Sequence, residues 1–204
     1  MKESMAQRMY RMIKAVDAEA SITIATSSSQ VPQIRAHLGL DVEISVEPCR
    51  RDTFPAIALA ASYLSEKLGV EKDSPVIICP VDPYVEMEYF TCLKQMGDEV
   101  ENGDSKLVLM GIEPTYASAK YGYIIPDGEA PVGRVKEFKE KPDEKTAAEY
   151  IKQGALWNGG VFACKLSYLL NKADDLLGTA DYKALLGSYK KLDKISFDYA
   201  VVEK

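Results

Sequence analysis

Residues 76–83 of the chain are VIICPVDP, a short apolar run followed by two prolines on either side of a valine and an aspartate. An apolar run without polar alternation is typical of a strand that is buried on both faces. Proline cannot donate to a strand ladder, so the run ends there. We therefore expect a strand over 76–79, with Asp82 just beyond its carboxyl end. In open α/β sheets, that end faces the ligand crevice.

Similar apolar runs alternate with helical periods along the rest of the chain. Met5, Met9, Met12, Ile13 and Val16 share one stripe of a predicted helix. The alternation predicts an α/β fold, Rossmann-like, with a mixed but mostly parallel sheet and helices on both faces. The other predicted strands cover residues 21–26, 42–46, 107–112 and 121–125, with a weaker one at 195–198.

Two further helices are predicted from their terminal residues. Thr53 is a candidate N-cap, and Pro55 suits the first turn of the helix that follows. Thr146 and Glu149 have capping-box spacing, and Gly154 ends the second helix. Residues 97–106 are interpreted as a solvated turn between a helix and a strand.

Length and composition limit the classes of protein to consider. The 204 residues suffice for one domain, 1–204, with 47% hydrophobic residues and a net charge of -6. The acidic balance argues against nucleic-acid and membrane partners. Four cysteines without a CxxC pair and a single histidine favour a reduced, cytoplasmic protein without zinc or a Ser-His-Asp triad. His37 is interpreted as structural or solvent-facing.

Three sets of polar residues could carry chemistry, and each set also has a structural interpretation. Asp82 and Asp198 could ligate a hard cation, or they could be strand-end turn residues. Residues 47–56, EPCRRDTFPA, could present hydrogen-bond partners to a purine, or form a capped strand-to-helix turn. Residues 121–123 (YGY), 138–142 (FKEKP) and 157–160 (WNGG) have the ingredients of a sugar-phosphate pocket. A surface Lys/Glu pair and a core tryptophan would equally explain the last two.

Taken in order, these segments resemble the nucleotidyltransferase domain of the mannose-1-phosphate guanylyltransferases, also called GDP-mannose pyrophosphorylases. The resemblance is carried by six ordered blocks: EPCRRDTFPAIALAA from residue 47, CPVDP from 79, LVLMGIEPTYASAKYGYI from 107, FKEKPDE from 138, GALWNGGVF from 154 and ISFDYAVVEK from 195. It implies a GT-A-like fold and a cytoplasmic transferase that makes GDP-mannose and pyrophosphate from GTP and mannose 1-phosphate with Mg²⁺.

The resemblance also assigns residues. It implies that Asp82 and Asp198 bind Mg²⁺ and that, with Lys141 on the sugar phosphate, they are catalytic. The guanine and nucleotide residues would be Glu47, Arg51, Thr53, Ala56 and Asp82. The residues on the sugar phosphate would be Tyr121, Gly122, Glu140, Lys141 and Asn158.

The chain departs from the family pattern in several places. Asp52, Val81, Pro83 and Gly160 differ from the usual family residues, and residues 1–26 contain no glycine-rich phosphate loop. We therefore expect a domain truncated at both ends, without the family's first strand and with little transferase activity on its own. A related hexose-1-phosphate nucleotidyltransferase and a non-catalytic module for sugar-nucleotide binding or homo-oligomerisation remain alternatives.

Overall fold

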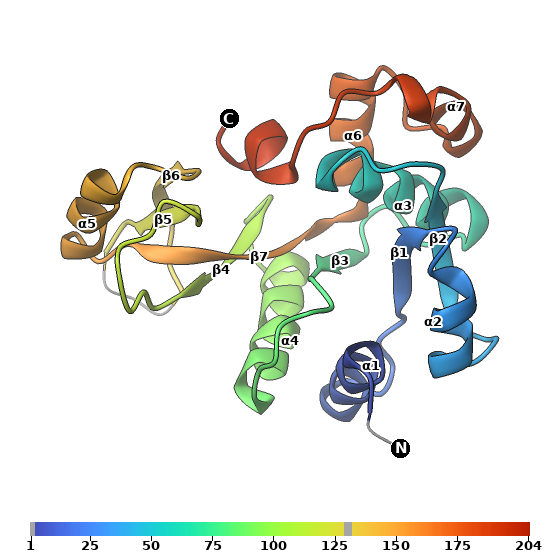
Figure 1. Ribbon diagram of the computed structural model, residues 1–204, viewed down its shortest axis with the longest axis horizontal. Helices are drawn as coiled ribbons and strands as arrows, with labels where there is room; N and C mark the ends of the chain where they lie inside the picture. Colours follow the sequence, from blue (N-terminus) through green and yellow to red (C-terminus); the bar gives the residue numbers. More distant parts are fainter. Residues whose placement is uncertain (1–2, 129–131) are drawn as a thin grey trace. The chain divides into compact units, whose positions relative to one another are not determined.

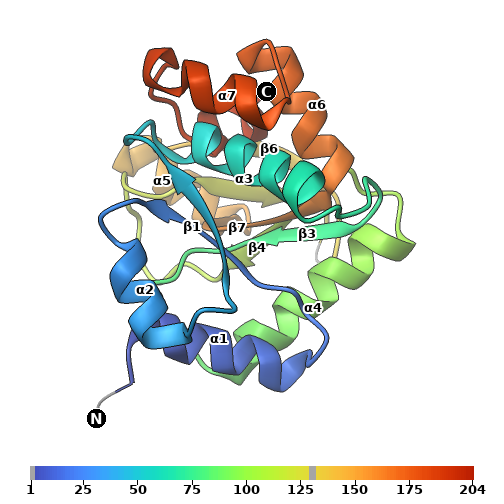
Figure 2. The same ribbon diagram turned by 90° about the vertical axis from the view of Figure 1, so that its right-hand side faces the viewer.

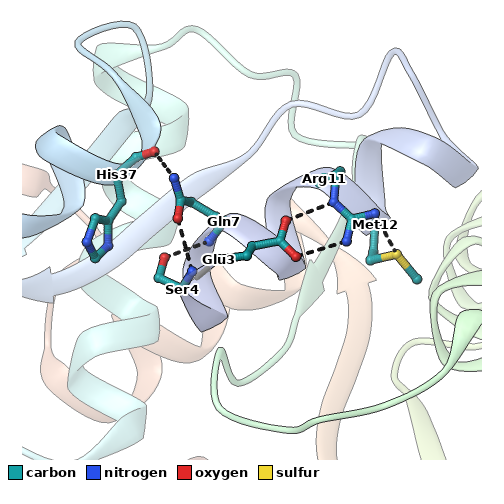
Figure 3. Close-up of polar contacts among 6 residues, drawn as sticks. All are labelled: Glu3, Ser4, Gln7, Arg11, Met12 and His37. Carbon is teal, nitrogen blue, oxygen red and sulfur yellow. Dashed lines mark hydrogen bonds and ion pairs between the residues drawn. The ribbon is translucent and has the colours of Figure 1, made fainter. Parts of the chain in front are cut away.

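The amphipathic period near the amino terminus forms helix α1 (Met5–Val16), as predicted. Ser4 and Gln7 make a reciprocal capping box, in which the Ser4 hydroxyl accepts from the Gln7 amide at 3.2 Å and Gln7 Oε1 accepts from the Ser4 amide at 3.0 Å (Figure 3). Met9 and Met12 are buried. Gln7 Nε2 also donates to the carbonyl of His37 at 3.0 Å, which ties α1 to helix α2 (Val31–Leu38).

The computed structural model describes residues 3–128 and 132–204, and the chain divides into two units (Figure 1). The first unit is Met1–Val108 with Phe162–Ser196, and the second unit is Leu109–Val161 with Phe197–Lys204. Strand β7 (Leu156–Lys165) contributes its first half to the second unit and its second half to the first. The assignment of 1–204 to one domain stays a prediction.

In the first unit, two pairs of strands are flanked by helices. β1 (Thr23–Ser27) pairs in parallel with β2 (Glu43–Glu47), and β3 (Pro75–Ile78) pairs antiparallel with β7, Val76 opposite Cys164. Helix α3 (Thr53–Lys67) packs on β1 and β2 (Figure 2). Besides α1, α2 and α3, this unit contains α4 (Met87–Asn102), α6 (Leu166–Leu177), α7 (Tyr182–Ser188) and the short 3₁₀ helix η1 (Tyr189–Lys191).

The second unit is built around a small sheet. β5 (Tyr123–Pro126) pairs antiparallel with both β6 (Val135–Lys139) and the first half of β7, and β4 (Val108–Ile112) also pairs with β7. Helix α5 (Glu144–Lys152) packs on β5. Tyr123, Ile125, Ala147 and Ala155 form the buried core. The unit ends with the π-helix η2 (Asp198–Val202).

The predicted α/β class with mixed strand directions is confirmed, but most of the strand pairings given for the described residues are antiparallel rather than parallel. β1 and β2 are parallel, whereas β3 with β7, β5 with β6 and β5 with β7 are antiparallel. Helical cover on a strand makes it apolar on both faces whichever way it runs, so composition does not fix direction. Among the described residues, β1 and β3 belong to separate sheets.

Several predicted boundaries need correction. Residues 195–198 are not a strand, because Asp198 opens the π-helix η2. The N-cap of α3 is Asp52 rather than Thr53, and that of α5 is Asp143 rather than Thr146. In each case a carboxylate earlier in the chain caps the helix. α4 continues to Asn102, so the turn predicted over 97–106 is shorter. No helix in the described part of the chain is long and apolar enough to cross a membrane.

Candidate sugar-phosphate site

The strand register of the second unit brings three of the predicted sugar-phosphate residues together. Tyr123 lies opposite Lys139 of β6 and opposite Trp157 of β7. Because both pairings are antiparallel, the residue before Tyr123 must lie beside the residue after each partner. Those residues are Gly122, Glu140 and Asn158. The backbone amide of Asn158 donates to the Gly122 carbonyl at 2.8 Å, which fixes one side of the group.

Glycine is the only residue type that position 122 accepts without displacement of its neighbours. A Cβ on Gly122 would lie 2.5 Å from Glu140 Oε2, 2.9 Å from Phe138 Cζ and 3.3 Å from Asn158 Cβ. The first two distances are shorter than van der Waals contact between such atoms. The missing side chain of Gly122 therefore leaves the space that the Glu140 carboxylate occupies.

Glu140 is the buried carboxylate of the site, with 7% of its surface exposed. Its Oε1 accepts from Lys141 Nζ at 2.5 Å, whereas its Oε2 is buried and has no hydrogen-bond partner among the described residues. Burial raises the pKa of Glu140, and the negative charge of Asp198 adds to this while the hydrogen bond from Lys141 opposes it. A buried acceptor without a partner is suited to a ligand hydroxyl.

Lys141 provides a cation next to this acceptor. Its side chain is 48% exposed, and its backbone has φ 46°, in the left-handed region that non-glycine residues seldom adopt. Its Nζ lies 5.5 Å from the centre of the Tyr199 ring. The hydrogen bond to Glu140 raises the pKa of Lys141, so the ammonium stays charged at neutral pH. A strained backbone that directs a half-exposed cation is typical of a ligand site.

Asn158 links the strand cluster to Asp198. Its Nδ2 donates to Asp198 Oδ1 at 2.5 Å, and its Oδ1 accepts from the Gly160 amide at 3.1 Å. Asp198 is half-buried and begins η2. The second unit therefore joins Gly122, Glu140, Lys141, Asn158 and Asp198 in one group, although they come from four separate segments.

Tyr121 lies at the side of this group in an aromatic cluster. Its ring centre is 4.8 Å from that of Trp157, which also lies 5.0 Å from the ring of Tyr116. Trp157 Nε1 donates to the Tyr123 hydroxyl at 3.1 Å, and Trp157 packs on the core of the second unit. Trp157 thus packs on the core and also contacts the exposed ring of Tyr121.

The predicted guanine residues lie in the first unit, around the start of α3. Glu47 ends β2 and accepts from the Tyr189 hydroxyl at 3.1 Å. Arg51 donates through Nε to the Tyr189 carbonyl at 3.4 Å and through Nη2 to the Lys190 carbonyl. Thr53 and Ala56 are in the first turn of α3. Both Glu47 and Arg51 are therefore held by η1, which supports the interpretation of residues 47–56 as a well-fixed turn.

Asp82 is an exposed residue of the first unit, beyond the carboxyl end of β3 as predicted. The segment after it is held by Arg8, which donates to the Val85 carbonyl at 2.5 Å and lies 4.3 Å from the Tyr84 ring centre. Burial raises the pKa of Tyr89, and Cys79, Cys92 and Asp82 add to the effect. Within the described ranges, no group of three His, Cys, Asp or Glu side chains could hold a metal. The carboxylates of Asp82 and Asp198 have the oxygen chemistry that Mg²⁺ prefers.

Three residues that support these groups were missed by the sequence analysis: Arg8, Tyr189 and Glu203. Arg8 is on the polar face of an amphipathic helix, where solvent exposure is the ordinary expectation. Tyr189 belongs to a 3₁₀ helix that has no hydrophobic period long enough to detect. Glu203 contacts the end of β6, a strand that was not predicted.

Comparisons with known proteins bear on the family to which the chain belongs. A family model described as nucleotidyl transferase matches residues 1–194. The chain is 31% identical over 229 residues to the mannose-1-phosphate guanylyltransferase RfbM of Salmonella typhimurium, covering 99% of the chain and 47% of that protein. It is 32% identical over 225 residues to the xanthan biosynthesis protein XanB of Xanthomonas campestris, covering 100% of the chain and 47% of XanB. The chain thus spans about half the length of these curated relatives.

A solved structure gives the same result for the fold. The crystal structure titled mannose-1-phosphate geranyltransferase, from Thermus thermophilus, superposes with a TM-score of 0.82 at 28% identity. The superposition covers 99% of this chain and 62% of that one. A family match over nearly the whole chain, together with this fold, leads to one assignment: the chain belongs to the nucleotidyl transferase family.

Proposed function

We propose that the group around Gly122 binds a hexose 1-phosphate, mannose 1-phosphate in the first instance, for transfer of a guanylyl group from GTP. The proposal rests on Glu140 Oε2, which is buried without a hydrogen-bond partner in the described part of the chain, beside the half-exposed Lys141. A hexose 1-phosphate offers both complementary groups, since its hydroxyls donate and its phosphate is an anion. The name of the relative RfbM, a mannose-1-phosphate guanylyltransferase, supports mannose as the sugar.

In this proposal, each residue has a separate task. Glu140 Oε2 accepts from a ring hydroxyl, Asn158 orients Asp198, and Lys141 binds the phosphate. Tyr121 offers an exposed aromatic ring, to which the apolar side of a sugar ring can bind. Gly122 leaves room for the Glu140 carboxylate beside the backbone.

The nucleotide belongs to the other set of predicted residues. Glu47, Arg51, Thr53, Ala56 and Asp82 are the proposed contacts of GTP, and Asp82 and Asp198 are the proposed ligands of Mg²⁺. When bound, Mg²⁺ would neutralise phosphate charge. Arg51 donates to two backbone carbonyls, so we propose that it shapes the start of α3 rather than reads the base by itself.

The reaction needs alignment and charge neutralisation more than a protein nucleophile. An oxygen of the sugar phosphate attacks the α-phosphorus of GTP and forms a new P–O bond. The bond from that phosphorus to the bridging oxygen breaks, and pyrophosphate leaves with the electron pair. The products are GDP-mannose and pyrophosphate. Lys141 holds the attacking phosphate in this scheme.

Calorimetric titration of the full chain with mannose 1-phosphate tests the proposal. We expect binding, with Lys141→Ala weakening it about tenfold or more, because a charge-assisted contact to phosphate is lost. Lys152→Ala is the matched control, since Lys152 pairs with Glu149 on the exposed surface of α5. Free mannose should bind with equal, weak affinity to both variants. Unchanged affinity for mannose 1-phosphate in Lys141→Ala would refute the assigned role.

A further inference from the structure

The last residues of the second unit contact two different segments of the candidate site. Asp198, at the start of η2, accepts from Asn158 of β7, and the Tyr199 ring lies beside Lys141. Glu203, just after η2, contacts the end of β6. One short turn of helix therefore connects the strand end that carries Glu140 with the strand that carries Asn158.

Glu203 makes the contact to β6 with a single carboxylate oxygen. Its Oε1 accepts from Lys139 Nζ at 2.7 Å and, at a longer 3.4 Å, from the backbone amide of Glu140. Its own amide donates to the Asp198 carbonyl at 2.9 Å, closing η2. The side chain is 21% exposed, so water screens this ion pair less than it screens one on an open surface. The hydrogen bond from Lys139 lowers the pKa of Glu203, which keeps the carboxylate ionised.

The position of this contact matters because the chain turns sharply just after it. Lys139 is the last residue of β6, and Lys141, two residues on, has φ 46°. A backbone in that region persists only when its surroundings fix it. The Glu203 carboxylate holds the amide of the residue between them, Glu140. Glu203 thus contacts the backbone at the point that determines the direction of the Glu140 and Lys141 side chains.

We propose that Glu203 is a positioning residue, which fixes the Glu140 backbone against η2 so that Glu140, Lys141 and Asp198 address one ligand. Only the identity of that ligand, a hexose 1-phosphate, rests on the proposed function. The positioning itself is a property of the protein without a ligand.

Two substitutions separate position from charge. Glu203→Gln keeps an oxygen that can accept from Lys139 and from the Glu140 amide, but removes the negative charge. Glu203→Ala removes both. Glu149→Ala is the control, because Glu149 forms an exposed ion pair with Lys152 in the same unit. If Glu203 acts by holding the Glu140 backbone in position, Glu203→Gln should preserve the site and Glu203→Ala should not.

The experiment combines amide hydrogen exchange of Glu140, without ligand, with a mannose 1-phosphate titration of each variant. We expect Glu203→Ala to speed Glu140 exchange at least tenfold and to weaken binding about tenfold. Glu203→Gln and the control should stay within about threefold of the parent chain. A circular-dichroism melt of each variant checks that it folds. If Glu203→Ala does not fold, Glu203→Gln is compared with the parent chain instead.

Two results would overturn the positioning role. In one, Glu203→Ala leaves Glu140 exchange and affinity within twofold of the parent. In the other, Glu203→Gln weakens binding and speeds Glu140 exchange as much as Glu203→Ala does. The loss would then come from the missing charge rather than from the position of the Glu140 backbone. If the parent chain itself does not bind mannose 1-phosphate, the proposed function fails, while the exchange comparison still decides the role of Glu203.

Discussion

At the scale of single residues, the site depends on the absence of a side chain at Gly122. The place of its side chain is taken by the Glu140 carboxylate, whose second oxygen is buried without a partner among the described residues. The sequence marked Gly122 and Glu140 as binding residues but could not show that they are adjacent. That adjacency depends on the register of β6 with β5, and β6 was not predicted.

Gly122→Ala should therefore damage both stability and binding. The added methyl group would overlap Glu140 and Phe138, and overpacking of this kind costs about 1–3 kcal/mol. Urea unfolding measures the loss. Gly187→Ala is the control, because a Cβ there meets nothing within 4 Å in helix α7. That change should be neutral or stabilise the chain by roughly 0.5–1 kcal/mol. Equal stabilities of the two variants would show that the close contacts at Gly122 are absent.

Glu140 should also give the chain a characteristic pH dependence. Its pKa is raised in the folded state, mainly by burial, so its contribution to stability is complete below its unfolded pKa. That contribution is lost as the pH rises through the folded pKa. The unfolding free energy of Glu140→Gln, relative to the parent, should therefore increase from about pH 4 to pH 7. Glu149→Gln, on the exposed face of α5, should give a flatter difference. A relative stability that falls with pH would mean that Lys141 outweighs burial.

At the scale of elements, apolar content decided what could be predicted. The strands near 21–26, 42–46, 76–79, 107–112 and 121–125 are present because each is an apolar run, whatever its direction. β6 is VKEFK, and β7 begins LWNGG, so charge and glycine hid both. Residues 195–198 are apolar enough for a strand, yet they lead into η2, where Asp198 accepts from Asn158.

The start of α5 allows a test of the corrected helix boundary. Asp143 accepts from the Thr146 amide at 2.8 Å and from the Thr146 hydroxyl at 3.0 Å. Asp143→Ala should lower the urea midpoint more than Thr146→Ala does, because only Asp143 satisfies a free amide of the first turn. The reverse order would support the boundary predicted from the capping-box spacing, with Thr146 as the N-cap.

At the scale of the whole molecule, the residues proposed for the two ligands belong to different units. Glu47, Arg51, Thr53, Ala56 and Asp82 are in the first, and the group around Gly122 is in the second. Because the chain has a net charge of -6, an accompanying cation would reduce the repulsion between the protein and an anionic nucleotide. The sequence could propose both sets from the family resemblance, but contacts such as that between Tyr189 and Glu47 required the folded chain.

Asp82→Ala in the first unit and Lys141→Ala in the second should therefore each affect one ligand. With Mg²⁺, GTP should raise the melting temperature more than UTP or dTTP does, and Asp82→Ala should reduce that shift. The same variant should keep the parent's affinity for mannose 1-phosphate, whereas Lys141→Ala should show the opposite pattern. Equal shifts by all three nucleotides would argue against guanine selection, and loss of both ligands in Asp82→Ala would argue against separate sets.

The most direct measurement is a crystal structure of the chain with mannose 1-phosphate. We expect the phosphate within hydrogen-bond distance of Lys141 Nζ and a sugar hydroxyl on Glu140 Oε2, about 2.6–3.2 Å away. We also expect the backbone of Gly122 to contact the ligand. A ligand bound elsewhere, with Glu140 Oε2 still without a partner, would contradict the assignment of this group as the sugar-phosphate site.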